Sequence, residues 1–82
     1  MKYLVHVFIL PHDELRDPQG MAVEAALRRL GLEASDARVG KIVRFALEAP
    51  DEASARAQIE DVSRRLLTNP VIEGFWYEVE EE

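Results

Sequence analysis

Four prolines divide this 82-residue chain and constrain its fold more than any other feature. Pro11 follows an apolar run and should end it as a strand, because proline cannot donate to a sheet ladder. Pro18 and Pro50 each lie beside an aspartate at the start of a helical pattern. Pro70 ends the second pattern, since the residue before a proline is pushed out of the helical region. The chain is therefore predicted to run strand, helix, one or two strands, helix, strand.

The first predicted strand, Lys2 to Leu10, has one clean apolar face and one mixed face. Its odd positions are all apolar, whereas its even positions also include Lys2 and His6. A strand of this kind is often covered on both sides, by its own helices and by something else.

Two segments have helical spacing. The first has Asp17 as its N-cap, Pro18 in its first turn and Gly31 in the left-handed position that closes a helix. The second begins at Pro50-Asp51 and runs to about Leu67. The predicted buried positions are Val23, Ala26, Leu27 and Leu30 in the first helix, and Ala55, Ile59, Val62 and Leu66 in the second.

Between the helices, residues 37–49 alternate apolar with polar or small side chains, and Gly40-Lys41 interrupts the pattern. This segment is either one long strand with a bend, which we favour, or two strands with a tight turn. The last strand is predicted from Val71 to Val79. Its alternation places Phe75 and Tyr77 on one face, and Trp76 with Ile72 on the other.

These elements predict an α+β fold: a two-layer sandwich with two helices on one face of an antiparallel sheet. The length predicts a single domain, residues 1–82. The net charge of −6 lies mostly at the end, because five acids and no base follow from Glu73 onward. Residues 80–82 are expected to form a frayed acidic tail, and a domain this small often needs self-association.

Composition excludes several classes of function. There is no basic stripe for nucleic acid and no cysteine for a disulfide, a thiolate metal site or a Cys nucleophile. The run YLVHVFIL is too short for a membrane span and lacks a cleavage site, so we expect neither an anchor nor a leader. No catalytic residue, metal ligand or cofactor-binding residue is predicted, and a reducing cytoplasm fits.

Four motifs in order give the chain a resemblance to a known family. They are DPQG from Asp17, the spacing of Ala26, Leu27, Leu30 and Gly31, RVGK from Arg38, and LLTNPVIE from Leu66. Together they resemble the PurS family, the small subunit of phosphoribosylformylglycinamidine synthase. The chain departs from the family in the loop HDELR after Pro11 and in Gly74-Phe75 after NPVIE, which affects only how that loop and the last strand would touch partners.

The resemblance implies a non-catalytic subunit of a complex in de novo purine biosynthesis. Such a subunit self-associates through its sheets, as a homodimer or tetramer, and bridges a large synthetase subunit and a glutaminase subunit. It would support ammonia transfer between their sites. It binds no cofactor itself, and ATP and Mg are used by the synthetase.

Residues that a minimal monomer explains least are the candidates for the interface. Gly20 costs about 1 kcal/mol relative to alanine in a helix, so its presence suggests that another backbone or a ligand comes close. Gln19 lies in a first turn that would favour an acid. Arg38 and Lys41 could meet an acidic patch on a partner or line a solvated edge. The candidates are Gln19, Gly20, Arg38, Lys41, Ile72 and Trp76.

Two other classes of function stay open from the sequence. One is a dimeric regulatory domain that binds a small molecule at its seam; tight binding of glutamine or a nucleotide by the isolated protein would favour it. The other is a small enzyme of acylphosphatase-like architecture. That enzyme needs an anion-cradling loop with an arginine, and Arg16 is the one candidate, in a loop without glycine.

Overall fold

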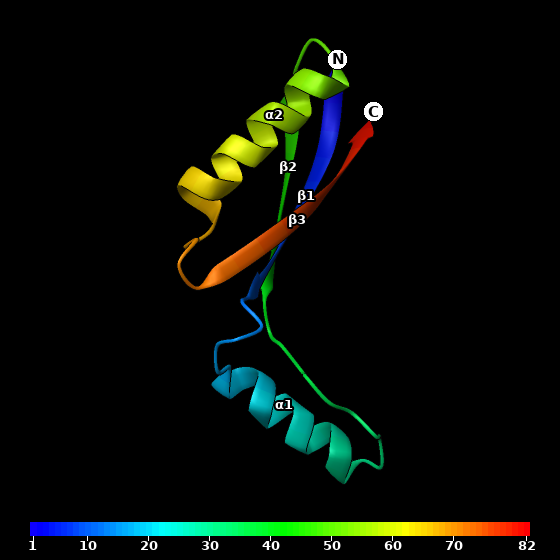
Figure 1. The fold of residues 1–82 in the computed structure, drawn as a ribbon. Helices are drawn as coiled ribbons and strands as arrows, with labels where there is room; N and C mark the ends of the chain where they lie inside the picture. Colours follow the sequence, from blue (N-terminus) through cyan, green and yellow to red (C-terminus); the bar gives the residue numbers. More distant parts are fainter.

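The computed structural model describes residues 1–82, and its strands and helices follow the predicted order (Figure 1). The last helix passes without a break into a π-helical turn, η1. The elements are β1 (Lys2–Pro11), α1 (Pro18–Arg29), β2 (Lys41–Glu48), α2 (Glu52–Val62), η1 (Ser63–Leu67) and β3 (Glu73–Glu81). None of the helices combines the length and the apolar character needed to cross a lipid bilayer.

The three strands form one antiparallel sheet in the order β2-β1-β3, with β1 in the centre. Val5 of β1 lies opposite Phe45 of β2 and Val79 of β3. Tyr3, Val5, Val7 and Ile9 of β1 are all buried, as the alternation predicts, and form the floor of the core. The antiparallel sheet and the strand and helix order are therefore confirmed.

Helix α2 covers this floor. Ala55 and Ile59 of α2 are fully buried, and Ile59 packs with Val5, Val7 and Ile9 of β1. Asp51 caps the helix as predicted, accepting a hydrogen bond from the Ser54 N–H at 2.8 Å. Local capping and an apolar stripe thus place this helix where the sequence pattern requires it.

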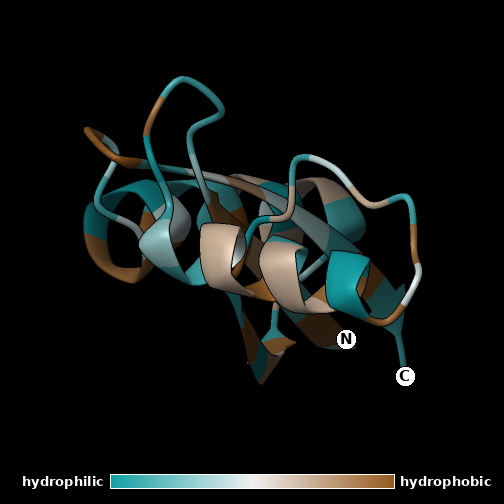
Figure 2. Cartoon of the chain, turned by 90° about the horizontal axis from the view of Figure 1, so that it is seen from below, coloured by the Kyte–Doolittle hydropathy of each residue, from teal (hydrophilic) through white to brown (hydrophobic).

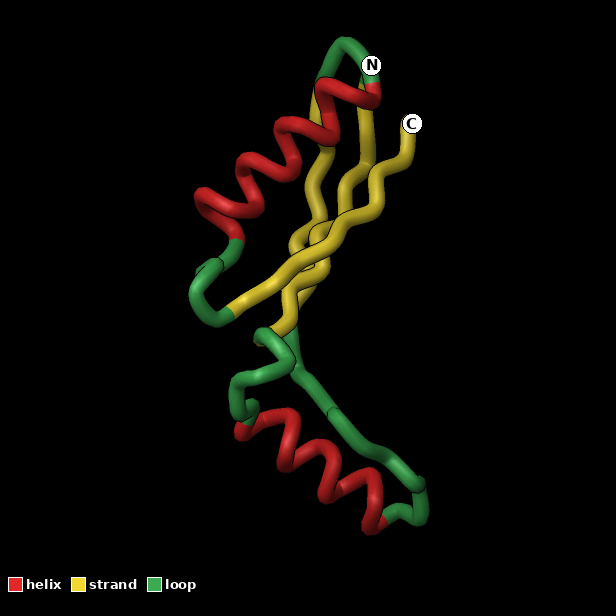
Figure 3. The backbone as a smooth tube through the Cα atoms, viewed as in Figure 1, coloured by secondary structure: helices red, strands yellow, loops and turns green.

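Helix α1 differs from the prediction in its position, because it lies beyond the end of the sheet and not on its face (Figures 1 and 3). Gly20 is its one buried residue, and no residue of α1 belongs to the buried core. The chain is correspondingly elongated, with principal extents of 49 × 27 × 14 Å. Residues 37–39, which follow α1, contact the start of the helix and hold it away from the sheet.

The segment between the helices contains one strand, which is shorter than the bent strand we favoured. β2 begins at Lys41, opposite Ile9, and residues 37–40 run on toward α1 without a strand partner. They stay unpaired because β1 leaves the sheet at Pro11, shortly beyond this point. Gly40 is needed at the crossing, since a Cβ there would overlap the carbonyl oxygen of Ile9.

The last strand starts and ends two residues later than predicted, at Glu73 and Glu81 instead of Val71 and Val79. A turn over residues 70–72 follows Pro70, with the Ile72 and Glu73 N–H groups both donating to the Asn69 carbonyl. Glu80 and Glu81 pair with Leu4 and Tyr3 within the sheet, so they belong to the strand and not to a frayed tail.

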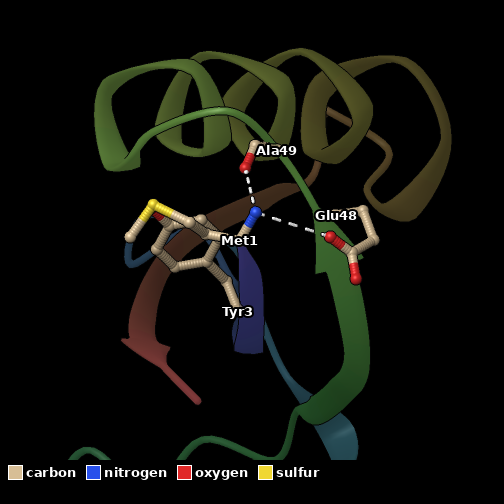
Figure 4. A network of polar contacts seen from close by, with 4 residues as sticks. All are labelled: Met1, Tyr3, Glu48 and Ala49. Atoms are coloured by element: carbon tan, nitrogen blue, oxygen red, sulfur yellow. Dashed lines mark hydrogen bonds and ion pairs between the residues drawn. The ribbon is translucent and has the colours of Figure 1, made fainter.

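Polar contacts tie the N-terminus to the end of β2 and the residue after it, at the end of the sheet away from α1 (Figure 4). The Met1 amino group donates to the Ala49 carbonyl at 3.0 Å and lies 3.6 Å from a Glu48 carboxylate oxygen. Burial, with the nearby Glu81 carboxylate, raises the pKa of the Tyr3 hydroxyl. This end of the domain is closed by its own chain.

Candidate assembly surface

One face of the sheet has no helix or loop over it, and we call it the open face. Its side chains alternate with the buried ones along all three strands. They are Leu4, His6, Phe8 and Leu10 from β1, Ile42, Arg44 and Ala46 from β2, and Trp76, Glu78 and Glu80 from β3. Every one of these residues from β2 and β3 is exposed, and those from β1 are half-buried by their neighbours.

An apolar row crosses the open face near its α1 end. Ile42, Phe8 and Trp76 lie opposite one another on the three strands. The Phe8 and Trp76 rings stack with centroids 5.1 Å apart and an angle of 12° between their planes. Trp76 is still 50% exposed and Ile42 60% exposed. Apolar side chains held in a rigid row and left in water are typical of a protein–protein contact.

A charged row lies next to the apolar one. Arg44, His6 and Glu78 lie opposite one another, with a base on the β2 side and an acid on the β3 side. The next row ends in Glu80 beside Leu4. The open face is therefore divided, with its apolar part toward α1, positive charge along β2 and negative charge along β3. Such a division fixes how a partner can be oriented.

A shallow hollow lies where the apolar row meets Gly40 and Lys41. Its volume is about 350 Å³, and it is lined by Phe8, Ile9, Leu10, Gly40, Lys41, Ile42 and Trp76. It brings together two of the predicted interface residues, Lys41 and Trp76. Both are exposed, and their strands lie on opposite sides of β1.

Three further candidates lie at the junction between α1 and the sheet. The Arg38 guanidinium donates to the carbonyls of Leu15 and Asp13, each at 2.7 Å, and so closes the loop before α1. Gly20 is buried, and a Cβ there would overlap the Ala37 carbonyl oxygen. The close backbone that Gly20 indicated is therefore one of the chain's own. Gln19 is exposed beside it.

Asp17 completes this junction in a way that the capping pattern did not predict. Its side chain makes no cap on α1 but accepts a hydrogen bond from the Val39 N–H at 2.9 Å. This bond is the main reason that the pKa of the Asp17 carboxyl is below its usual value. Asp17 thus connects the start of α1 to the unpaired residues 37–40 before β2.

Ile72 lies apart from the other candidates. It is in the turn before β3, 47% exposed, and its carbonyl accepts from the His12 N–H at 2.9 Å. The alternation that grouped Ile72 with Trp76 assumed that the strand had already begun there. Trp76 itself is on the open face, and Phe75 and Tyr77 pack toward the core.

Sequence reasoning missed the β2 part of the open face, Ile42 and Arg44, and its partner Glu78. Their position depends on the register between strands that are far apart in sequence, which no local pattern contains. The sequence signal that pointed to this surface was the mixed face of β1, because the even positions of β1 lie at the centre of each row.

Comparison with known proteins gives consistent matches along the chain. Residues 4–81 match the family model PurS, described as phosphoribosylformylglycinamidine (FGAM) synthase. A phosphoribosylformylglycinamidine synthase subunit PurS from Synechocystis sp. is 37% identical over 78 residues, which is 94% of this chain and 78% of that protein.

Solved structures share the fold. PurS of Thermus thermophilus superposes with a TM-score of 0.88 at 31% identity, covering 100% of this chain and 99% of that one. A chain in the structure of PurLQS from Thermotoga maritima superposes with a TM-score of 0.83 at 30% identity, covering 100% and 99%. Such values over complete chains indicate the same arrangement of helices and strands.

Proposed function

Because the chain belongs to the PurS family of phosphoribosylformylglycinamidine synthase subunits in purine biosynthesis, we propose that it acts without catalysis of its own, as the subunit that bridges a synthetase and a glutaminase. The observation that carries the proposal is the open face, with its exposed row of Ile42, Phe8 and Trp76. A relative of the same fold occurs in a PurLQS structure.

The bridging role follows from the chemistry of glutamine-dependent amidation. A glutaminase releases ammonia, and an ATP-activated amide consumes it at another site. Ammonia that reaches bulk water is protonated and loses its nucleophilic lone pair. A rigid subunit that holds the two sites in register, and limits water between them, supports this transfer without breaking any bond itself. ATP and Mg²⁺ would then be used by the synthetase, and this chain would bind no cofactor.

The open face is suited to self-association as well. A two-fold axis parallel to β1 would place β2 of one copy over β3 of the other, so that Arg44 faces Glu78 on both sides of the axis and each apolar row meets itself. We expect this contact to include Trp76 and Lys41. Gln19, Arg38 and Ile72 remain proposed contacts for the larger subunits.

Reconstitution tests the bridging proposal. Synthetase and glutaminase subunits are mixed with and without this protein, and glutamine-dependent amidation, ammonia-dependent amidation and complex formation are measured. We expect omission to abolish the glutamine-dependent rate and the complex while leaving the ammonia-dependent rate. Unchanged complex formation and glutamine-dependent activity on omission would contradict the proposal.

A variant pair locates the surface. Trp76→Ala removes the largest exposed side chain of the apolar row, and Glu33→Gln changes an exposed loop residue as a control. Trp76→Ala should reduce the mass of the isolated protein by light scattering, and Glu33→Gln should not. Isothermal titration of the isolated protein with glutamine and nucleotides separates this role from a small-molecule sensor, which would bind one of them tightly.

We expect the assembly to act in the cytoplasm. The chain has no cysteine, so it has no disulfide that would need an oxidising compartment to form.

A further inference from the structure

Strand β3 is one edge of the sheet, and its outer side pairs with no other strand of the chain. The Glu82 N–H donates to the Lys2 carbonyl at 2.8 Å, and hydrogen-bonded pairs recur at every second residue of an antiparallel ladder. The even-numbered residues of β3 therefore bond to β1. The N–H and C=O groups of Phe75, Tyr77 and Val79 point the other way, and none of the chain's loop, turn or cap hydrogen bonds reaches them.

A groove lies along this free edge, between β3 and helix α2. Its volume is about 570 Å³. On its α2 side, Arg56 lies 5.6 Å from the centre of the Tyr77 ring, and Arg64 lies 5.5 Å from the centre of the Phe75 ring. Gly74 lines the groove although it has no side chain, so the groove reaches the backbone of β3.

The chain itself holds the wall of this groove in place. The Arg56 Nε donates to a Glu52 carboxylate oxygen at 3.0 Å, one turn back along α2. The His12 Nε2 lies 3.0 Å from the Pro70 carbonyl oxygen, which joins the loop after β1 to the turn before β3 and closes one end of the groove. A strand added here would meet a formed wall, which lowers the cost of ordering on this side of the contact.

The charges along β3 indicate what such a strand must carry. Five acids and no base follow from Glu73 onward, and Figure 2 shows the C-terminal end of the chain as hydrophilic. Glu78 and Glu80 are exposed on the open face, beside Trp76, which is 50% exposed. Opposite charges directly across neighbouring strands are favourable and like charges are not. A strand beside β3 is therefore favoured by bases opposite the two glutamates and an apolar side chain opposite the tryptophan.

The α2 wall does not select the sign of the partner's charge. Glu60 lies between Arg56 and Arg64 along α2, so this wall carries both signs. Selection by charge therefore falls to the side chains of β3 that reach the open face.

A second copy of this chain does not fit the β3 edge. Pairing of two β3 edges would place one acidic strand beside another, which is unfavourable. Pairing of β3 with the β2 edge of another copy would supply bases, but it would leave a free edge at each end and continue as an open filament. The occupant that fits is an extended segment of a different protein.

We infer that the outer edge of β3 is a docking site for an extended basic segment of a partner protein. The segment pairs antiparallel with the free backbone groups of Phe75, Tyr77 and Val79, in the manner of strand addition to a sheet edge. Antiparallel pairing is the more stable direction per residue. Backbone hydrogen bonds give the affinity, and Glu78 and Glu80 select the basic side chains.

This inference deepens the proposed bridging function, on which it rests for the presence of a partner protein. It adds a second surface and a mode of recognition. The β3 edge is separate from the open face, so a partner segment and a second copy of the chain can bind at the same time.

Hydrogen exchange, measured residue by residue by NMR, tests the edge in the isolated full chain. The N–H groups of Phe75, Tyr77 and Val79 should exchange rapidly, and those of Trp76 and Glu78, which bond to β1, at least about 10-fold more slowly. Slow exchange at all five residues at about 100 µM protein would show that the edge is already covered, and would overturn the inference.

The same measurement in the complex tests the occupant. The chain is reconstituted with the synthetase and glutaminase subunits, labelled with deuterium, quenched and read by mass spectrometry at single-residue resolution. Phe75, Tyr77 and Val79 should gain at least about 10-fold protection. Unchanged exchange at these residues would overturn the inference. Equal gains at odd and even residues of β3 would also overturn it, because they would indicate burial of the strand without pairing.

A charge reversal tests the selection of a basic segment. Glu80→Lys places a base where the partner is expected to carry its own, and Glu33→Lys makes the same change of charge in an exposed loop as a control. Both side chains are exposed, so both variants should keep the wild-type circular dichroism spectrum. The dissociation constant of the complex should rise at least about 5-fold for Glu80→Lys and stay within about 2-fold for Glu33→Lys. Equal effects would overturn the inference.

A synthetic peptide tests the chemistry without any other subunit. The probe has about eight residues, in which lysine, arginine and isoleucine alternate with valine, and its control has glutamate in place of both bases. Neither peptide is aromatic, so the emission of Trp76, the one tryptophan of the chain, reports binding. We expect a blue shift with the basic peptide at about 1 mM and none with the acidic one. Equal shifts, or no shift with the basic peptide, would overturn the inference.

These outcomes separate the docking edge from the bridging function. A complex that forms and supports amidation while the β3 edge stays free would contradict the docking edge alone. A chain whose β3 edge binds the basic peptide but that does not join the synthetase to the glutaminase would contradict the bridging function alone.

Discussion

Helices α1 and α2 have the same kind of sequence pattern and opposite surroundings. Both begin beside an aspartate and a proline, and both have apolar residues at helical spacing. α2 buries Ala55 and Ile59 on the sheet, whereas α1 buries only Gly20, against the return segment, residues 34–39, that follows the helix. The difference teaches that the spacing of apolar residues shows which side of a helix needs cover but not which surface, or which chain, covers it.

The largest difference between the helices should appear when an apolar side chain is truncated. Ile59→Ala should lower the free energy of unfolding by about 2–5 kcal/mol, because Ile59 is fully buried against β1. Leu30→Ala on α1 should cost less than about 0.5 kcal/mol in the monomer, since Leu30 is 78% exposed there. Urea titration at low protein concentration measures both. A cost for Leu30→Ala equal to that for Ile59→Ala at low concentration would show that α1 is covered within its own chain.

The second prediction concerns Gly20 within α1 and Gly31 just after it. Gly20→Ala should destabilise the protein by about 3 kcal/mol, the upper end of what overpacking costs, because the Ala37 carbonyl that its Cβ would meet belongs to the backbone. Gly31→Ala should cost about 1–2 kcal/mol, because there the penalty is the left-handed backbone and the surrounding space is open. Thermal unfolding of both variants gives the comparison, and a neutral Gly20→Ala would show that the return segment can move away.

The third prediction compares how the helices begin. Asp51→Ala should cost about 1 kcal/mol, because it removes the cap on the Ser54 N–H. Asp51→Ser keeps a capping oxygen and should recover most of that loss. Chemical denaturation measures both variants, and equal losses for alanine and serine would indicate that Asp51 acts through something other than the cap.

The smallest expected effect is a dependence of stability on pH that originates at Asp17. Its folded-state pKa is lowered mainly by the Val39 N–H, so its contribution is fully present above the unfolded value of about 4 and is lost as the pH falls through the folded value. Asp17→Asn keeps an acceptor but cannot titrate.

Thermal melts between about pH 6 and pH 2, which bracket the titration of an ordinary carboxyl, should therefore show the wild type losing stability more steeply than Asp17→Asn. Parallel pH profiles for the two proteins would contradict this role for Asp17.

Much of the fold could be predicted because its signals are local. Pro11 ends β1, Asp51 caps α2, Gly31 closes α1, and the odd positions of β1 form the floor of the core. The strands whose ends differ from the prediction are those whose ends depend on pairing with another strand. β2 begins at Lys41, opposite Ile9, because β1 ends only two residues further on, at Pro11, and residues 37–40 run on toward α1. β3 extends to Glu81 because Tyr3 is available opposite it.

The candidate surface was predictable only in part for the same reason. Trp76 and the mixed face of β1 could be found from alternation, but Ile42, Arg44 and Glu78 join them only through the register of the sheet. Arg38 and Gly20 were noticed as unusual, and the structure places them in contacts within the junction at α1.

The amino-acid sequence by itself determined the order of the elements, the cap of α2, the end of α1 at Gly31 and which side of each element is apolar, because these depend on neighbours within a few residues. Only the tertiary structure decided that α2 covers the sheet while α1 extends beyond it. That outcome depends on contacts between residues distant in sequence, such as Asp17 with Val39 and Gly20 with Ala37, which hold one apolar stripe away from the sheet that would otherwise bury it.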